Sequence, residues 1–311
     1  MNLFNATLPF SYLAIVAIFL AGISFTFLLF GIVASCLIII CIYCGIIRIS
    51  PILDGIVNLF SYAYPGFTES VKQNLRDSFV LEYPEGKPRN GNFLFGFHPH
   101  GLFSVANIFH IGTDLTTWSI RPIQATVLDK LYLLPFSKEI LDRVSATPSN
   151  YNSMKAVLTK GESLTVCLGG TREILYTEKN VMKLSILNKK GIFRLAIETG
   201  TPLIPVISYG ENELFEIVKH PWLTSIQTIL LEYGICIPLP TLQSCKTWFN
   251  ILQKPMKNPI RTVVGKVIEV GVARVASDKD ISELRDQYFT ALRHLYSTTR
   301  PEAYSKDLEI I

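Results

Sequence analysis

The sequence predicts an α/β fold, in which helices flank a mostly parallel sheet and an N-terminal transmembrane helical hairpin precedes them. The sheet is predicted by three apolar runs with strand character, at residues 93–97, 163–168 and 202–208, each ending in a polar loop that contains glycine. Helical patterns separate these runs, which is typical of βα units. The hairpin is predicted by a charge-free N-terminus, since no Asp, Glu, Lys or Arg precedes Arg48.

The N-terminal segment is the most apolar part of the chain. Residues 12–47 are almost continuously apolar, which is longer than the roughly 20 residues of one untilted membrane span. Two alternatives fit: a tight helical hairpin broken around Gly31, or one tilted span followed by an interfacial helix. A cleaved signal peptide is disfavoured because the basic n-region is missing and the apolar stretch is too long. We therefore expect residues 1–50 to form a membrane anchor of one or two apolar helices.

The next segment, residues 51–80, begins apolar and carries Tyr62, Tyr64 and Phe67. Aromatic side chains favour the headgroup level of a bilayer, so we expect an interfacial amphipathic segment here. It would connect the anchor to a folded domain at residues 81–311.

The charges around the apolar block predict its orientation. Arg48, Lys72 and Arg76 all follow the block, and only the terminal amine precedes it. Under the positive-inside rule, this asymmetry places residues 81–311 on the cytosolic side. The six cysteines agree with a reducing compartment, because no pair has zinc-finger spacing and a chain this long needs no disulfides.

The overall charge limits the partners. The net charge of +4 is small and no basic stripe is interleaved with aromatic residues, so nucleic acid is not expected. A mild positive excess beside a membrane anchor suits anionic headgroups or a phosphate-rich cofactor. No metal site is expected, because further ligands at a recognisable spacing are missing.

Further elements are predicted around the three runs. We expect helices at residues 102–111, 152–160, 191–199, 224–233 and 280–297, and a helix-rich connection at residues 130–141. Strands are expected at residues 120–127 and 261–270, the latter as strand–turn–strand around Gly265, and a loop is expected at residues 237–259. Gly161 and Gly200 suit helix C-termini, and Ser277 suits an N-cap.

The first run ends in His98-Pro99-His100-Gly101. Pro99 cannot donate to a sheet ladder and Gly101 frees the backbone to turn, so the strand should end here. The carboxyl ends of strands in open α/β sheets are where ligands bind, and an imidazole there is well placed for proton transfer. The alternatives are two structural histidines or a His-x-His metal pair.

Polar side chains also follow the other two runs. These loops read Gly169-Gly170-Thr171-Arg172-Glu173 and Tyr209-Gly210-Glu211-Asn212-Glu213. Because the carboxyl ends of parallel strands share one edge of a sheet, we expect both loops to lie beside His98 and His100.

Together these residues are similar to a known family. Residues 97–101, Phe-His-Pro-His-Gly, resemble the signature of the type-2 diacylglycerol acyltransferases, which include monoacylglycerol and wax-alcohol acyltransferases. Three further blocks resemble motifs of that family: residues 169–173 its Gly-Gly-x-x-Glu, residues 190–196 its Arg/Lys-x-Gly-Phe-x-x-x-Ala helix, and residues 205–215 its Pro-Val-x-x-x-Gly-Glu-Asn stretch. Order and spacing agree over roughly residues 80–270.

The sequence also departs from the family. Its upstream Tyr-Phe-Pro element is reduced to Tyr83-Pro84, and Gly170-Thr171-Arg172 is similar to the Glu-Gly-Thr-Arg block of the wider glycerophospholipid acyltransferases. In that block the arginine is considered to hold the acceptor's phosphate. The wider superfamily's His-x4-Asp is absent, since Phe103 and Val105 stand where the Asp would follow either histidine. Another group must therefore orient the imidazole.

The resemblance implies a membrane-bound O-acyltransferase domain at residues 81–311, in the endoplasmic reticulum membrane and facing the cytosol. It would move a fatty acyl group from acyl-CoA to the hydroxyl of diacylglycerol and form triacylglycerol. Acyl-CoA would be a co-substrate, and no further cofactor is implied. Monoacylglycerol, a long-chain alcohol and a lysophospholipid are alternative acceptors. An alternative of another class is a non-catalytic lipid-binding protein with the same fold.

Acyl transfer to a hydroxyl needs a base and donors for the developing oxyanion. The resemblance implies that His98 or His100 is the base. His98 is favoured because it occupies the place of the superfamily's catalytic histidine, and His100 would orient it or contact the acceptor. Glu173 and Glu211 would orient an imidazole or bind the acceptor, unless they are simply exposed or ion-paired. Cys167 lies in an apolar run and is expected in the core rather than as a nucleophile.

Substrate binding is expected from Gly101, Gly169, Gly170, Arg172, Arg194, Glu211 and Asn212. Arg172 would bind phosphate in bidentate fashion, or else pair with Glu173 or another neighbour. Arg194, with Lys189 and Lys190, would meet the phosphates of coenzyme A, or else form a solvated helix face.

Overall fold

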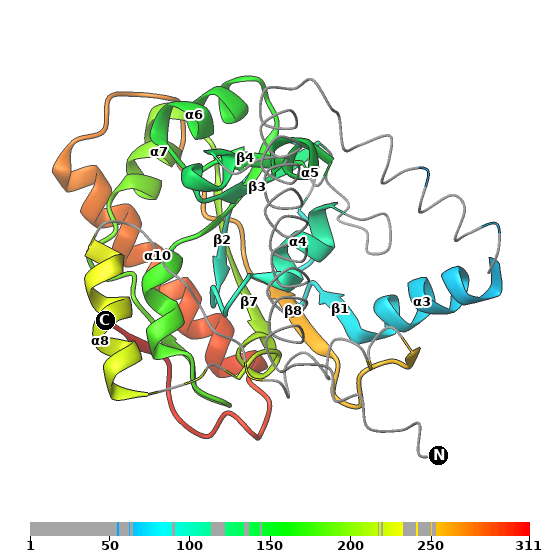
Figure 1. Ribbon diagram of the computed structural model, residues 1–311. Helices are drawn as coiled ribbons and strands as arrows, with labels where there is room; N and C mark the ends of the chain where they lie inside the picture. Colours follow the sequence, from blue (N-terminus) through cyan, green and yellow to red (C-terminus); the bar gives the residue numbers. More distant parts are fainter. Residues whose placement is uncertain are drawn as a thin grey trace, which may run out of the picture.

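The computed structural model describes residues 65–88, 91–112, 122–133, 137–143, 145–216, 220–232 and 253–311, with the single residues 55, 62, 218, 241 and 250 (Figure 1). The expected membrane anchor at residues 1–50 and most of the expected interfacial segment before residue 65 lie outside these ranges. Within the described part, no helix combines the length and apolar character needed to span a membrane.

A mixed sheet of seven strands forms the centre of the described chain (Figure 1). In spatial order, the strands are β1 Phe79–Glu82, β8 Ile260–Val264, β7 Leu203–Tyr209, β2 Leu94–His98, β5 Ser163–Cys167, β3 Ile123–Val127 and β4 Ala146–Pro148. Neighbouring strands are parallel except at the β7–β8 pair, so β8 and β1 run opposite to the other five. The predicted mostly parallel sheet is confirmed.

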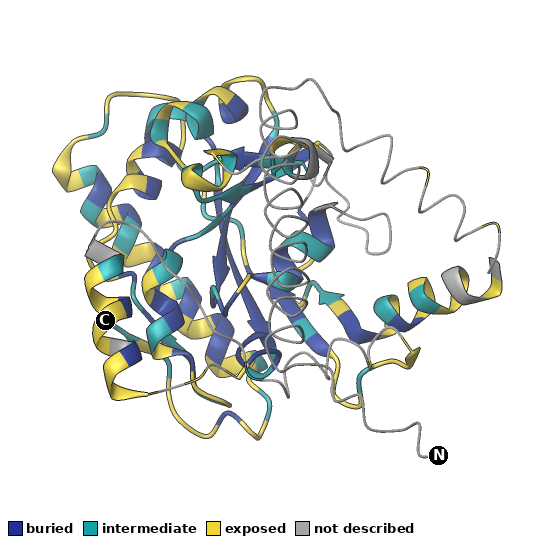
Figure 2. Ribbon diagram, viewed as in Figure 1, coloured by how far each residue is buried: buried dark blue, intermediate teal, exposed yellow. Residues whose placement is uncertain are grey.

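Helices cover both faces of this sheet (Figure 2). The α-helices are α3 Pro65–Ser78, α4 Val105–Gly112, α5 Ser137–Arg143, α6 Tyr151–Thr159, α7 Gly191–Thr199, α8 Pro221–Glu232 and α10 Asp278–Thr299, and the 3-10 helices are η1 Asp129–Leu133, η2 Gly170–Tyr176 and η3 Glu211–Glu213. Apolar residues of α6, α7 and α10 share a core with Leu94 and Leu164. Those of α4 share the opposite core with Phe95 and Phe97. Because side chains alternate along a strand, β2 supplies both cores and is buried throughout.

In two of these helices, particular residues explain where the helix begins or ends. In α7, Ile192 and Leu195 are buried at helical spacing, and Gly200 ends the helix with φ 64°, a left-handed conformation that glycine adopts without strain. In α10, the Ser277 hydroxyl accepts the Asp280 amide while the Asp280 carboxylate accepts the Ser277 amide, which forms a capping box. The end of α7 at Gly200 and the start of α10 after Ser277 both agree with the sequence prediction.

One predicted strand is wrong. β8 precedes Gly265 as expected, but the segment after Gly265 meets the sheet only as an isolated bridge between Ile268 and Leu203 among the described residues. The Gly265 amide donates to the Pro205 carbonyl at 2.8 Å, so the chain stays beside β7 for one more residue before it leaves the ladder. A side chain at Gly265 would lie 3.0 Å from Pro205, which explains the glycine.

Short or irregular elements were also missed. β1 and β4 have four and three residues, and β6 Lys183–Leu184 pairs with β9 Glu309–Ile310 in a separate two-stranded sheet. Runs of this length carry too little periodicity to be recognised. α8 begins at Pro221 rather than at the predicted residue 224, because proline suits a first helical position.

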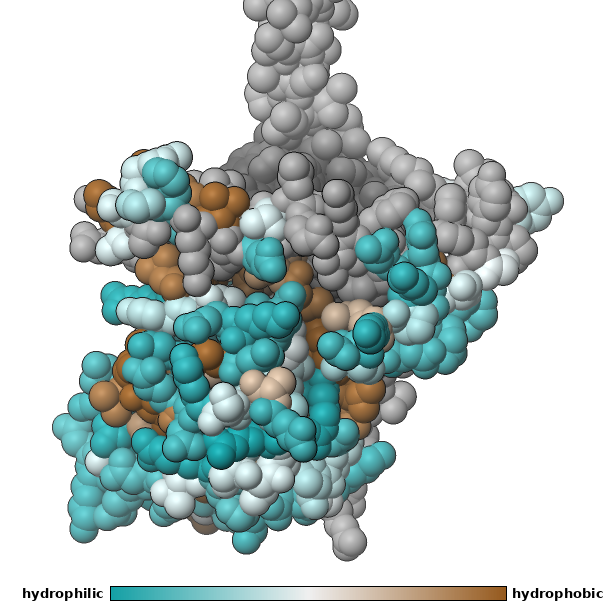
Figure 3. Space-filling model, turned by 90° about the horizontal axis from the view of Figure 1, so that it is seen from below, coloured by the Kyte–Doolittle hydropathy of each residue, from teal (hydrophilic) through white to brown (hydrophobic). Residues whose placement is uncertain are grey.

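α8 leaves apolar side chains exposed. Trp222, Ile226 and Ile229 are 59%, 46% and 57% exposed. Their spacing of four and three residues places them on one side of the helix, whereas Leu223 and Gln227 are buried. Seen from below, the molecule carries separate apolar areas among hydrophilic ones (Figure 3).

Candidate active site

His98 ends β2 and is completely buried. Its Nε2 lies 2.8 Å from the hydroxyl of Tyr288, a residue of α10. Its Nδ1 has no hydrogen-bond partner in the part of the chain that the structure describes. Burial lowers the pKa of His98 to about 3, so the ring is neutral near pH 7. A neutral imidazole keeps one unprotonated nitrogen, which can accept a proton.

His100 follows after Pro99 and is half-buried. Its Nδ1 lies 3.1 Å from the Gly101 carbonyl. Because a carbonyl only accepts, Nδ1 carries the proton and Nε2 is unprotonated. Burial lowers the pKa of His100, and the hydrogen bond to Gly101 opposes this. Both histidines are therefore neutral rings, each with one unprotonated nitrogen that can accept a proton.

Glu173 of η2 is buried and contacts the backbone of the histidine motif. Its Oε2 accepts the His100 amide at 2.9 Å, and its Oε1 accepts the Ser185 amide at 3.0 Å. Burial raises the pKa of Glu173 to about 7, against the two amides and Lys189, which lower it. A Cβ at Gly169 would lie 1.9 Å from this carboxylate, so glycine provides its space. Glu173 thus holds the backbone of the motif. From the sequence we expected it to orient an imidazole or to bind the acceptor.

Glu211 comes from the loop after β7 and caps α4. Its two oxygens accept the amides of Val105 at 2.6 Å and Ala106 at 3.0 Å. A carboxylate is favoured at a helix N-terminus, where amides lack partners. Burial raises the pKa of Glu211 to about 7. Gly101 has φ 56°, and a Cβ there would lie 2.7 Å from the Glu211 side chain. Glu211 and Gly101 therefore fix how the chain turns from the motif into α4.

The predicted basic residues are on the surface. Arg172 is exposed and forms no ion pair with the described residues, so the alternative of a salt bridge to Glu173 is wrong. Arg194 is exposed on α7, and Lys189 and Lys190 are exposed just before it. Lys189 is close enough to Glu173 to affect its pKa.

Two further predicted residues, Gly170 and Asn212, contribute to the shape of the loops that contain them. Gly170 turns with φ 60°, and a Cβ there would meet no atom within 4 Å. The Asn212 amide donates to the Val181 carbonyl at 3.1 Å. Asn212 thereby connects the loop after β7 to the segment after η2.

Cys167 ends β5 and has a thiol with local partners. Its Sγ lies 2.9 Å from the Ser104 hydroxyl and accepts from the Asn107 amide at 3.6 Å. Burial raises the pKa of Cys167 to about 12. The thiolate is therefore negligible at neutral pH, which agrees with the prediction of a structural cysteine.

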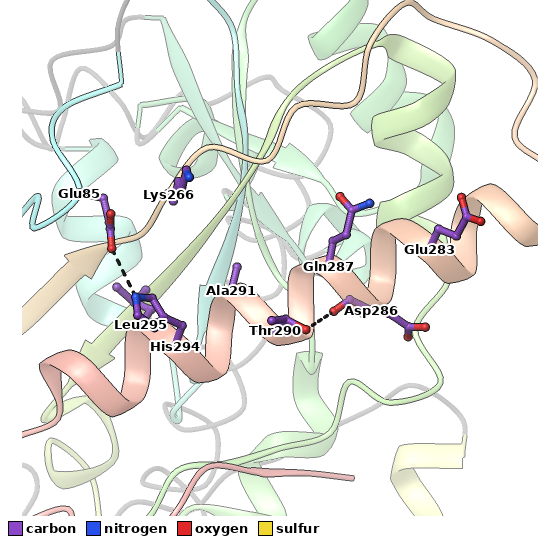
Figure 4. A pocket seen from close by; sticks show the side chains of 9 residues that line it. All are labelled: Glu85, Lys266, Glu283, Asp286, Gln287, Thr290, Ala291, His294 and Leu295. Carbon is purple, nitrogen blue, oxygen red and sulfur yellow. Dashed lines mark hydrogen bonds and ion pairs between the residues drawn. The ribbon is translucent and has the colours of Figure 1, made fainter.

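A separate groove of about 770 Å³ lies along α10 (Figure 4). Side chains of α10, with Glu85 after β1 and Lys266 after β8, line it. His294 and Glu85 approach to 3.9 Å across it. No predicted site residue lines this groove.

Sequence reasoning missed Tyr288 and Ser185. The absent His-x4-Asp indicated that some group must hold the imidazole, but nothing marked a tyrosine 190 residues away. Ser185 contributes its backbone amide, which no side-chain pattern reveals. The described residues contain no group of three or more His, Cys, Asp and Glu able to hold a metal ion.

A family model for diacylglycerol acyltransferase matches residues 80–310. Diacylglycerol O-acyltransferase 2A of Umbelopsis ramanniana is 32% identical over 234 residues, covering 70% of this chain and 64% of the relative. Diacylglycerol O-acyltransferase 2 of Dictyostelium discoideum is 26% identical over 227 residues, covering 70% and 68%. 2-acylglycerol O-acyltransferase 1 of Bos taurus is 32% identical over 216 residues, covering 66% and 64%.

This chain thus spans slightly less than two thirds of the Umbelopsis and bovine relatives. Among solved structures, the 1-acyl-sn-glycerophosphate (LPA) acyltransferase PlsC from Thermotoga maritima matches with 13% identity and a TM-score of 0.44, covering 85% of this chain and 96% of that one. This likeness is too low to support an argument. The family match, by contrast, includes the histidine motif and both glutamate loops. The chain belongs to the diacylglycerol acyltransferase family, as its motifs predicted.

Proposed function

We propose that this protein transfers a fatty acyl group from acyl-CoA to the hydroxyl of diacylglycerol and forms triacylglycerol. The observation that carries the proposal is His98, a neutral imidazole with an unpartnered buried Nδ1 at the carboxyl end of β2. Membership of the family and the names of the fungal and amoebal relatives support the choice of substrate.

In the proposed reaction, the acceptor oxygen attacks the thioester carbonyl carbon. A carbon–oxygen bond forms, the carbon–sulfur bond breaks, and the hydroxyl proton passes to the imidazole of His98. The imidazole then gives this proton to the departing thiolate, so free coenzyme A leaves and the histidine is restored. Glu173 and Glu211 keep the surrounding backbone in place through their amide contacts. Arg194, with Lys189 and Lys190, would attract the phosphates of coenzyme A.

We further propose that the protein works at the endoplasmic reticulum membrane with residues 81–311 in the cytosol. Diacylglycerol and triacylglycerol dissolve in the bilayer, so the site must open at its surface. The apolar residues 12–47 and the exposed apolar side of α8 both support contact with lipid.

The test is an acyl-transfer assay in liposomes with labelled oleoyl-CoA. Diacylglycerol, monoacylglycerol, hexadecanol and lysophosphatidic acid are offered as acceptors to wild type, His98→Ala and His100→Ala. We expect labelled triacylglycerol from wild type and its loss in His98→Ala that still folds. His294→Ala, an exposed histidine in the separate groove, is the matched control and should retain activity.

Other outcomes would overturn parts of the proposal. Label in diacylglycerol would favour the activity named for the bovine relative. Label in phosphatidic acid would mean that Arg172 binds an acceptor phosphate. Loss only in His100→Ala would make His100 the base. No transfer to any acceptor, from folded protein, would favour a non-catalytic lipid-binding protein.

A further inference from the structure

The Tyr288 hydroxyl has two neighbours at the end of β2. It lies 2.8 Å from Nε2 of His98 and 3.2 Å from the carbonyl oxygen of Gly96. A hydroxyl has a single proton to donate, and a carbonyl oxygen can only accept. Burial raises the pKa of Tyr288 well above 10, so this proton stays on the phenol.

These contacts favour one arrangement of protons. If Tyr288 donates to Gly96, its oxygen accepts from Nε2–H of His98, so both hydrogen bonds are formed and only the unprotonated Nδ1 is left without a partner. If Tyr288 instead donates to Nε2, Gly96 loses this donor and the proton of His98 moves to Nδ1. A buried N–H would then have no acceptor among the described residues, which costs on the order of 1–3 kcal/mol.

We infer that Tyr288 is a positioning residue that fixes His98 as its Nε2–H tautomer and leaves Nδ1 as the nitrogen that takes the acceptor's proton. The role of Nδ1 as the base rests on the proposed function. The tautomer of His98 rests only on its contacts with Tyr288. Tyr288 thereby takes the place of the absent His-x4-Asp, using a neutral phenol where a carboxylate would be expected.

The surroundings of Tyr288 hold its hydroxyl in place. Its ring packs edge-on against Phe193 of α7, with 5.6 Å between ring centroids, and the residue is fully buried. A Cβ at Gly96 would lie 2.0 Å from the hydroxyl, so glycine in β2 makes room for this contact. The hydroxyl therefore reaches the strand at the one point where its backbone is uncovered by a side chain.

The same contact would help during the reaction. When Nδ1 takes a proton, the ring becomes a cation and its Nε2–H becomes a stronger donor. Hydrogen bonds from a charged donor are roughly twice as strong as neutral ones. Tyr288 therefore stabilises the protonated ring more than the neutral ring, which lowers the barrier without contact to either substrate.

The first measurement is the ¹⁵N NMR spectrum of ring-labelled histidine in the full chain in detergent micelles, with His98 assigned by its loss in His98→Ala. We expect a protonated-type shift for Nε2 and an unprotonated-type shift for Nδ1. The opposite pattern in wild type would overturn the inference. Because this spectrum needs no turnover, it remains decisive even if no acceptor is acylated and the proposed function fails.

The second measurement is the kinetics of Tyr288→Phe beside Tyr296→Phe. Tyr296 lies on the same helix and donates to the Lys306 carbonyl at 2.7 Å, away from His98. We expect kcat of Tyr288→Phe to fall about 10- to 100-fold with KM nearly unchanged, a part of what a general base contributes. Tyr296→Phe should keep the wild-type kcat. An unchanged kcat in folded Tyr288→Phe would contradict the inference.

Discussion

The carboxylate of Glu173 holds the backbone amide of His100 at 2.9 Å and leaves both imidazoles of the motif to other partners. Its second oxygen holds the amide of Ser185. One buried side chain thus joins the end of β2 to the segment before α7. The geometry of the motif therefore depends on an acid that has no need to touch a substrate.

Glu173→Gln should weaken both the fold and the reaction. Glutamine offers one carbonyl oxygen, so one of the two amides would face an NH₂ group. Removing an acceptor from a buried donor costs about 2 kcal/mol. We expect the free energy of unfolding in urea to fall by about that amount, with a lower kcat.

The matched control is Glu178→Gln, because Glu178 is an exposed acid that approaches Lys306 to 3.8 Å. Its stability should change by less than about 0.5 kcal/mol. Equal effects of the two substitutions would disprove the role of Glu173.

Glu211 should make stability depend on pH. Burial raises its pKa from 4.5 to about 7, so the folded state binds the proton more tightly than the unfolded state. Its contribution to stability is complete below pH 4.5 and declines as pH rises through 7. Urea unfolding across this range should show a smaller decline in Glu211→Gln than in wild type. Parallel profiles would mean that Glu211 does not titrate there.

Gly101 and Gly170 form a matched pair for backbone strain. Both have a left-handed φ, 56° and 60°, but only at Gly101 would a Cβ meet a neighbour, 2.7 Å from Glu211. Gly170→Ala should cost about 1 kcal/mol from conformation alone. Gly101→Ala should cost more, and should lower kcat because it displaces the cap of α4. Thermal unfolding of both variants provides the comparison, and equal costs would argue against the clash.

Cys167→Ser should remain active. The serine hydroxyl can still accept from Ser104 and Asn107, and the buried thiol has a pKa of about 12, so it is no nucleophile. We expect kcat within about threefold of wild type, or less than about 1 kcal/mol in activation free energy. Mass spectrometry of protein quenched during turnover should find no acyl group on Cys167. An acylated Cys167 would establish a covalent route.

The strands that carry the site were predictable because each has an apolar run long enough to identify. Their shared edge follows from parallel pairing, which brings His100, Glu173 and Glu211 near one another. The partners of these carboxylates were not predictable, since backbone amides leave no trace in residue types. The role of Tyr288 could not be predicted for another reason. It occurs four residues from both Leu284 and Leu292 on the buried side of α10, where any large apolar side chain would fit the pattern.

The contact between Tyr288 and His98 also orders events during synthesis. His98 leaves the ribosome 190 residues before its partner, so β2 can join the sheet while its last side chain still lacks the phenol. Only the arrival of α10 completes the strand's end. A chain interrupted between Gly101 and α10 therefore carries the whole histidine motif without the phenol that holds His98, and we expect such a fragment to be inactive.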